Sequence, residues 1–142
     1  HASRLYGDKV FWLDADAVTE KHVPLNFLDE CLPDDKFCCY LGREGWYYTE
    51  SGFIGFNSEH PIAKRFLRDY AHVFIVGSIF TQQWWHDCIA FDHARQGIPA
   101  NNLTPKGRNY DAVMEQSVLH PYLTHLKGNR KYEETGPKVR WA

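Results

Sequence analysis

Apolar residues in the first half of the chain form short continuous runs that end at turn residues. Residues 10–13 (Val-Phe-Trp-Leu) end at an acidic turn, and residues 37–41 end at Gly42. Continuous apolar runs of this length are typical of strands that are buried on both faces of a sheet. Residues 46–49 and 53–56 predict two more strands, so the first half of the chain is expected to supply most of a sheet.

A helical period appears in three other segments. Residues 24–32 predict a short helix, and residues 61–74 place apolar side chains at helical spacing after a segment rich in capping residues. Residues 81–96 predict a helix that ends at Gly97. Residues 98–109 are rich in Pro, Asn, Gly and basic residues and predict a loop, and the remaining tail has only weak periodicity. Strands and helices together predict an α/β fold.

The composition changes this picture mainly by excluding some classes of protein. Hydrophobic residues make up 44% of the chain and aromatic residues 15%, which is typical of a folded protein. A formal net charge of −2 disfavours nucleic-acid binding, which requires a strongly basic face. No apolar run reaches the roughly 20 residues of a membrane span, and no signal peptide is visible. We expect residues 1–142 to form a single domain and, because His1 stands just ahead of a strand, to belong to a longer protein.

The positions of charges and cysteines add two expectations. Residues 1–60 contain eleven acidic and five basic side chains, whereas residues 105–142 contain four acidic and seven basic ones. This imbalance suits a site that holds a cation and a phosphate together, although two solvated faces would give the same counts. The four cysteines form no CxxC pair or disulfide framework, so we expect free, mostly buried thiols and a reducing, cytoplasmic location.

Two carboxylates stand where the first predicted strand meets a loop. Asp14 and Asp16 flank Ala15 directly after residues 10–13. Carboxylates that leave water need a compensating partner, and a divalent cation such as Mn²⁺ or Mg²⁺ supplies one while also bridging a diphosphate. Open α/β sheets also bind their ligands at the carboxyl ends of strands. A metal site and a solvated acidic turn both fit this pattern.

A basic segment near the other end of the chain has complementary chemistry. The sequence His-Leu-Lys-Gly-Asn-Arg-Lys starts at His125. The imidazole of His125 suits Mn²⁺ and similar ions, and Gly128 lets the backbone approach a bulky anion. Lys127, Arg130 and Lys131 carry charges that suit phosphate oxygens. Alone, this segment also fits a basic surface loop with one incidental histidine.

Together the two segments resemble those of a known enzyme family. A strand followed by DxD, with a distal H-x-x-G-x-x-K, is similar to the glycosyltransferases of the GT-A fold, above all the retaining glycogenin-like and bacterial galactosyltransferase-like group. Residues 12–16, 48–53 and 85–87 also resemble glycosyltransferase domains found in phage and bacterial genomes. The sequence departs from the glycogenin-like group at Tyr132, where that group has Pro-Trp, and the family's N-terminal nucleotide-binding βαβ portion does not precede the DxD strand here.

The resemblance implies a fold, an activity and a set of residue roles. The implied fold is a Rossmann-like mixed sheet with flanking helices. The implied activity is transfer of a sugar from a nucleotide-diphosphate sugar to a saccharide or other hydroxyl acceptor, with retention of configuration favoured. Mn²⁺, or Mg²⁺, would be bound by Asp14, Asp16 and His125. The remaining expected contacts are those to donor phosphates, at Gly128, Lys131, Lys127 and Arg130, and those to substrate, at Ser51, Gly52, Trp85 and His86.

Two further carboxylates are candidates for chemistry at the acceptor. Asp87 follows Trp85 and His86 near the start of a predicted helix and would act as a base on the acceptor hydroxyl, as an inverting enzyme requires. A first-turn acid that complements the helix dipole fits Asp87 equally well. Glu50 lies next to a glycine in an apolar segment, where either a contact to a sugar hydroxyl or a structural role would explain a carboxylate. Trp85 would stack on a sugar face.

Three other functions fit part of the pattern. A metal-dependent phosphotransferase or nucleotidyl hydrolase would use the same carboxylates, but the P-loop motif G-x-x-x-x-G-K-[ST] is absent from the sequence. An inactive, glycosyltransferase-like carbohydrate-binding module fits the aromatic content. A zinc-binding structural module is disfavoured because Cys38 and Cys39 are adjacent and have poor ligand spacing. The sequence makes no prediction of the oligomeric state.

Overall fold

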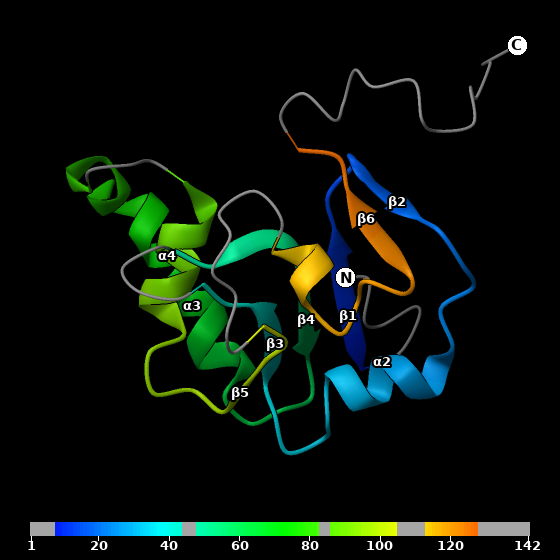
Figure 1. Ribbon diagram of the computed structural model, residues 1–142. Coiled ribbons are helices and arrows are strands. Elements are labelled where there is room, and N and C mark those ends of the chain that lie inside the picture. Colours follow the sequence, from blue (N-terminus) through cyan, green and yellow to red (C-terminus); the bar gives the residue numbers. More distant parts are fainter. Residues whose placement is uncertain (1–7, 44–47, 83–85, 105–112, 128–142) are drawn as a thin grey trace, which may run out of the picture.

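The structure, a computed structural model, describes residues 8–43, 48–82, 86–104 and 113–127. Within these residues the helices are α2 (Leu25–Cys31), α3 (Ala63–Ile75) and α4 (Asp87–Ala94), with short 3-10 helices η1 (Ser78–Thr81) and η2 (Met114–Gln116). The strands are β1 (Lys9–Leu13), β2 (Ala17–Thr19), β3 (Cys38–Leu41), β4 (Glu50–Asn57), β5 (Ala100–Asn102) and β6 (Leu123–His125) (Figure 1). None of these helices has the length and apolar character needed to cross a membrane. The predicted mixed α/β class is confirmed.

The strands form one mixed sheet of four and a separate pair. The order in the larger sheet is β1-β4-β3-β5, with β1 and β3 antiparallel to β4 and β5 parallel to β3. β2 and β6 pair antiparallel to each other in a two-stranded sheet. β4 lies inside the larger sheet and is mostly buried. Its side chains therefore contribute to the packing on both faces of that sheet.

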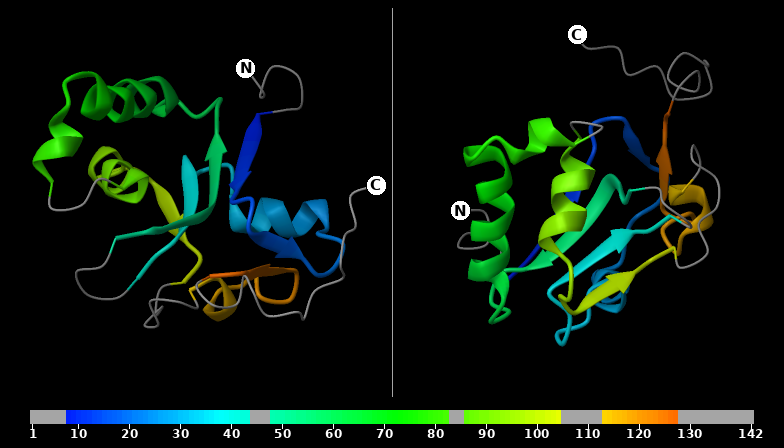
Figure 2. Two further views of the ribbon diagram at one scale, coloured as in Figure 1. Left: turned by 90° about the horizontal axis from the view of Figure 1, so that it is seen from above. Right: turned by 90° about the vertical axis from the view of Figure 1, so that its left-hand side faces the viewer.

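Both faces of the larger sheet are covered, by α3 and α4 on one side and by α2, η2 and the β2-β6 pair on the other (Figure 2). The side chains of β4 alternate between these faces because successive strand residues point in opposite directions. Ile54 packs in one core with Phe66 of α3 and Phe91 of α4, and Phe56 lies against that core. Phe53 packs in a second core with α2, η2 and β6. Full burial of each large apolar side chain contributes about 1.5–3 kcal/mol to stability.

The surroundings of β1 differ from the prediction. The apolar run forms a strand, but among the described residues β1 pairs only with β4, at the edge of the sheet. Trp12 is 58% exposed and Leu13 is 38% exposed, so the expectation of a strand buried on both faces is wrong. An edge strand has a sheet neighbour on one side only. The C-terminal end of β1 therefore lies at the surface, and the turn that contains Asp14 and Asp16 begins there.

The other predicted elements are confirmed to different extents. α2, α3 and β3 form where the sequence predicts two helices and a strand. The predicted strand over residues 53–56 lies within β4. Of the predicted strand over residues 46–49, residues 48–49 precede β4 and are not in a strand, and residues 46–47 lie outside the described part of the chain. The predicted helix over residues 81–96 is shorter in the structure, because η1 ends at Thr81 and α4 begins only at Asp87.

β5 is one of three short strands that the sequence pattern missed, together with β2 and β6. Residues 100–102 were expected in a loop, but they pair in parallel with β3. Three residues of the sequence Ala-Asn-Asn show neither an apolar run nor an alternation, so only hydrogen bonding to a neighbouring strand identifies them. Gly97, with a φ of 71°, stands just beyond α4, as predicted for a glycine after a helix.

Candidate metal centre

The turn between β1 and β2 presents two carboxylates at the open end of the edge strand. Asp14 and Asp16 lie in this turn, which is closed by a hydrogen bond from the Ala17 amide to the Asp14 carbonyl (3.0 Å). The Asp14 amide donates to the Gly52 carbonyl (3.1 Å) and so ties the turn to β4. The indole Nε1 of Trp12 donates to Asp14 Oδ1 (3.0 Å), which orients that carboxylate.

His125 reaches the same place from the far end of the chain. It is the last residue of β6 and pairs with Ala17 of β2, so the two-stranded sheet holds it beside Asp16, from which it is 109 residues distant in sequence. Its Nε2 lies 2.8 Å from Asp16 Oδ1 and 3.9 Å from Asp14 Oδ2. The histidine side chain is 4% exposed and the two aspartates 33% and 31%. The cluster is therefore closed on the histidine side and accessible to solvent on the carboxylate side.

These donor atoms fit a divalent cation. One ligand atom from each of Asp14, Asp16 and His125 lies within 4.8 Å of the other two. A small hard cation that binds its ligands at about 2.1 Å separates them by at most about 4.2 Å, so small side-chain rotations bring all three around one ion. Two carboxylates and an imidazole suit Mn²⁺, and the carboxylates also suit Mg²⁺. The three predicted ligands do lie together, while their occupancy by a metal stays a prediction.

A buried carboxylate stands behind the histidine. Glu50 is 4% exposed, and its Oε1 lies 3.7 Å from Nδ1 of His125, the ring nitrogen that does not face the aspartates. Oε1 also accepts a hydrogen bond from the Gly52 amide (3.2 Å), and Oε2 is bonded by Arg43 and Lys127. Metal-ligating histidines commonly present their second nitrogen to a carboxylate, which sets the tautomer and the ring orientation. Glu50 is in position to do this for His125.

The close approach of His125 depends on a glycine. A Cβ atom at Gly52 would lie 2.7 Å from Cε1 and Nδ1 of the His125 ring and 3.2 Å from Oε1 of Glu50. A contact shorter than 3 Å with a buried ring forces a displacement, because protein interiors are close-packed. Gly52 was expected to contact substrate; the structure places it against the histidine, where it leaves room for the imidazole.

A small polar cleft beside Glu50 brings several predicted substrate residues together. Asp87 is the first residue of α4, and its Oδ1 accepts hydrogen bonds from the Cys88 amide (2.9 Å) and the Ser51 hydroxyl (3.4 Å). The cleft has a volume of about 160 Å³ and is lined by Arg43, Thr49, Glu50, Ser51, His86, Asp87, Cys88 and Lys127. Four other predicted site residues lie outside the described part of the chain, namely Trp85, Gly128, Arg130 and Lys131.

One carboxylate that the sequence analysis did not single out fixes α4 against the start of β4. Asp92 accepts hydrogen bonds from the amide (2.8 Å) and the hydroxyl (2.6 Å) of Thr49. Arg95 donates to the same carboxylate at 2.6 Å and stacks over the ring of Tyr40, 4.1 Å from its centroid. These contacts hold Asp87, five residues earlier at the start of α4, near Ser51. The Asp92–Arg95 spacing of three on a predicted helix was the only signal in the sequence.

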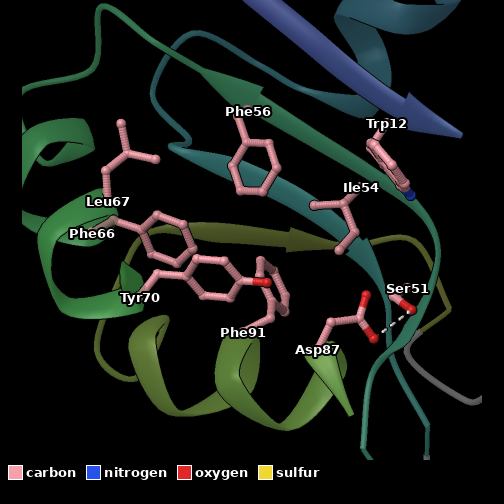
Figure 3. A pocket seen from close by; sticks show the side chains of 9 residues that line it. All are labelled: Trp12, Ser51, Ile54, Phe56, Phe66, Leu67, Tyr70, Asp87 and Phe91. Atoms are coloured by element: carbon pink, nitrogen blue, oxygen red, sulfur yellow. Dashed lines mark hydrogen bonds between the residues drawn. The ribbon is translucent and has the colours of Figure 1, made fainter. Parts of the chain in front are cut away.

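An apolar pocket adjoins the polar cleft, between β1, β4, α3 and α4 (Figure 3). It has a volume of about 300 Å³ and is lined by Trp12, Ser51, Ile54, Phe56, Phe66, Leu67, Tyr70, Asp87 and Phe91. Ser51 and Asp87 line both cavities, and the indole of Trp12 links the pocket to Asp14. Burial, with a smaller effect of the Asp87 charge, raises the pKa of Tyr70. Sequence reasoning missed this pocket because only the β1–β4 register, which sets Trp12 opposite Ile54, brings its walls together.

No protein-family model, curated protein or solved structure matches the chain.

Proposed function

We propose that this protein is a metal-dependent glycosyltransferase of the GT-A type, which transfers a sugar from a nucleotide-diphosphate sugar to a hydroxyl acceptor. The observation that carries the proposal is the convergence of Asp14, Asp16 and His125, from two segments far apart in the chain, on one cluster of possible metal ligands. The mixed α/β fold is compatible with this assignment. An acidic turn that was merely solvated would not need a buried histidine against it.

In this proposal the metal-ligand cluster binds the sugar donor. Asp14, Asp16 and His125 would hold Mn²⁺ or Mg²⁺ against the donor diphosphate. When bound there, such a cation neutralises the charge that develops on a departing diphosphate. Glu50 stands behind the imidazole, with Oε1 3.7 Å from Nδ1, and the aspartate carboxylates stay accessible for the phosphates to approach.

In this proposal Asp87 contacts the acceptor. It is exposed at the boundary of the polar cleft and the apolar pocket. One of its oxygens is bonded to Ser51, and the other points into the pocket (Figure 3). A carboxylate in this position accepts a hydrogen bond from an acceptor hydroxyl. It would take the hydroxyl proton in an inverting reaction and would orient the acceptor in a retaining one.

Calorimetric titration of this protein with UDP and GDP, with and without Mn²⁺, tests the donor site. We expect one nucleotide to bind only in the presence of the metal, and Asp14→Ala/Asp16→Ala to abolish that binding. Asp34→Ala/Asp35→Ala is the matched control, because it removes the same charge from an exposed acidic pair that forms ion pairs with Lys9 and Lys36. Metal-independent binding, or no binding of either nucleotide, would contradict the proposal. Release of nucleotide from a nucleotide sugar in the presence of an acceptor separates an enzyme from an inactive carbohydrate-binding module.

A further inference from the structure

The apolar pocket beside the metal cluster is shaped for a ring that carries few polar groups. We propose that it binds the acceptor through an apolar ring next to the reacting hydroxyl, and that a sugar is not its primary occupant. This inference rests on the proposed glycosyltransferase function and narrows it to acceptors that are hydroxylated and bear an aromatic or other apolar ring.

The pocket has a buried aromatic floor and an exposed apolar rim. Phe66 and Phe91 are each 2% exposed and Ile54 is 7% exposed, whereas Trp12 and Leu67 at the rim are 58% and 61% exposed. A ring that enters between them removes the rim side chains from water as well as its own surface, which is the driving force for apolar binding. The volume of about 300 Å³ is sufficient, since an apolar cavity of about 150 Å³ accepts benzene.

The scarcity of polar partners argues against a sugar in the same place. Among the lining residues only Ser51, Asp87 and Tyr70 have a hydroxyl or carboxylate, and the indole N–H of Trp12 donates to Asp14. A hexopyranose carries hydroxyl groups around most of its ring. Most of these would leave water without a hydrogen-bond partner in this pocket, and burial of unpaired polar groups is unfavourable.

Two of the three polar lining residues, Ser51 and Asp87, lie at one end of the pocket. Figure 3 shows Ser51 and Asp87 together at the end away from Leu67, with the indole of Trp12 between them and β1. These two residues also line the polar cleft that contains Glu50, and Glu50 faces His125 of the metal cluster. A ring seated on Phe66 and Phe91 thus directs its hydroxyl toward Asp87 and the side of the site where the donor is proposed to bind.

Two probes that differ only in the ring test this inference directly. Phenyl β-D-glucoside and methyl β-D-glucoside share the same sugar, and their binding is measured by calorimetry and by saturation-transfer NMR without metal or nucleotide. We expect the phenyl glucoside to bind at least about tenfold more tightly, the factor that corresponds to burial of one aromatic ring. We expect Leu67→Lys to remove this preference, and Leu25→Lys to retain it, because Leu25 is another exposed helical leucine (79%) that does not line the pocket.

The outcomes distinguish this inference from the proposed function. Equal affinity for the two glucosides, or a phenyl preference that survives Leu67→Lys, overturns the ring-binding pocket whatever the nucleotide titrations show. A phenyl preference that Leu67→Lys removes supports the pocket even if metal-dependent nucleotide binding fails, in which case only the glycosyltransferase proposal is lost. If Leu67→Lys does not give the circular dichroism spectrum of the folded protein, Trp12→Ala, at the other exposed rim position, replaces it with the same expected result.

Discussion

The metal-ligand cluster and the apolar pocket meet at Trp12 but are built in opposite ways. The cluster consists of side chains that the pairing of β2 with β6 brings together, and its carboxylates are partly open to solvent. The pocket instead continues the hydrophobic core on one face of the larger sheet, because Phe66 and Phe91 belong to both. One region would hold its ligand by charge and the other by apolar contact.

This difference separates residues that are expected to matter for ligand binding from residues that are expected to matter for stability. The side chains of the two aspartates are about one-third exposed, so their loss should change binding more than folding. The residues behind the cluster are different, because Glu50 is a buried charge bonded by Arg43 and Lys127. Substitution of the aspartates therefore tests mainly metal binding, whereas substitution of Glu50 tests mainly stability.

The largest effect is expected at the aspartates. Loss of a group that only supports a metal ligand weakens metal affinity by about 10–100-fold, so the loss of two ligands in Asp14→Ala/Asp16→Ala should exceed that range and make Mn²⁺ binding undetectable. The unfolding free energy, measured with urea, should stay unchanged or rise because two neighbouring like charges are removed. A loss of stability comparable to the loss of binding would show that the cluster has a structural role instead.

Glu50→Ala should have the largest effect on stability. It leaves the charge of Arg43, whose side chain is 9% exposed, without its buried carboxylate partner, and breaking such a pair destabilises by about 3 kcal/mol or more. Mn²⁺ affinity should also fall, by about tenfold, because His125 loses the carboxylate beside Nδ1. Urea unfolding and metal titration measure the two effects, and Glu59→Ala, on an exposed glutamate, is the control that should change neither.

A smaller effect is expected at Gly52. The Cβ of Gly52→Ala meets the His125 ring at 2.7 Å, and overpacking of this kind destabilises by about 1–3 kcal/mol. Displacement of the ring should weaken Mn²⁺ binding while Asp14 and Asp16 stay in place. Gly97→Ala is the control, since its φ of 71° makes alanine strained although nothing lies within 4 Å of the added atom. That variant should lose stability and keep its metal affinity; equal weakening of metal binding in both would refute a specific role for Gly52.

The smallest expected effect is on the pH dependence of the unfolding free energy. It compares one buried cysteine from each of the two hydrophobic cores. Burial raises the pKa of Cys38 and of Cys39 from 9.0 to about 12. Between these values the unfolded chain releases thiol protons that the folded protein keeps, so the unfolding free energy should fall as pH rises above about 9. Cys38 belongs to the core below the pocket and Cys39 to the core on the opposite face. Cys38→Ala and Cys39→Ala should each flatten the pH dependence of urea unfolding above pH 9 relative to wild type, whereas an unchanged slope would mean that the thiol concerned is not buried.

The local parts of the fold and the chemistry of the site were predictable from the sequence. A helical period over residues 62–74 sufficed for α3, a short segment that stops at a proline sufficed for α2, and a short apolar run sufficed for β3. Asp14, Asp16 and His125 were identified as possible metal ligands because carboxylate and imidazole groups have the required chemistry wherever they lie, and the motif order indicated that they belong together. The parallel strand β5 and the edge position of β1 were not predictable, since both depend on which strands become neighbours.

The sequence by itself thus determined the mixed α/β class, the short-range elements and the types of ligand available for a metal. Only the tertiary structure decided that Glu50 lies behind His125, that Gly52 makes room for that ring, and that Trp12 becomes a pocket wall. The physical reason is that periodicity and capping act between residues a few positions apart, whereas strand register and packing join residues that are far apart in the chain. The local pattern along the chain therefore specifies each element, while the contacts between elements specify the site.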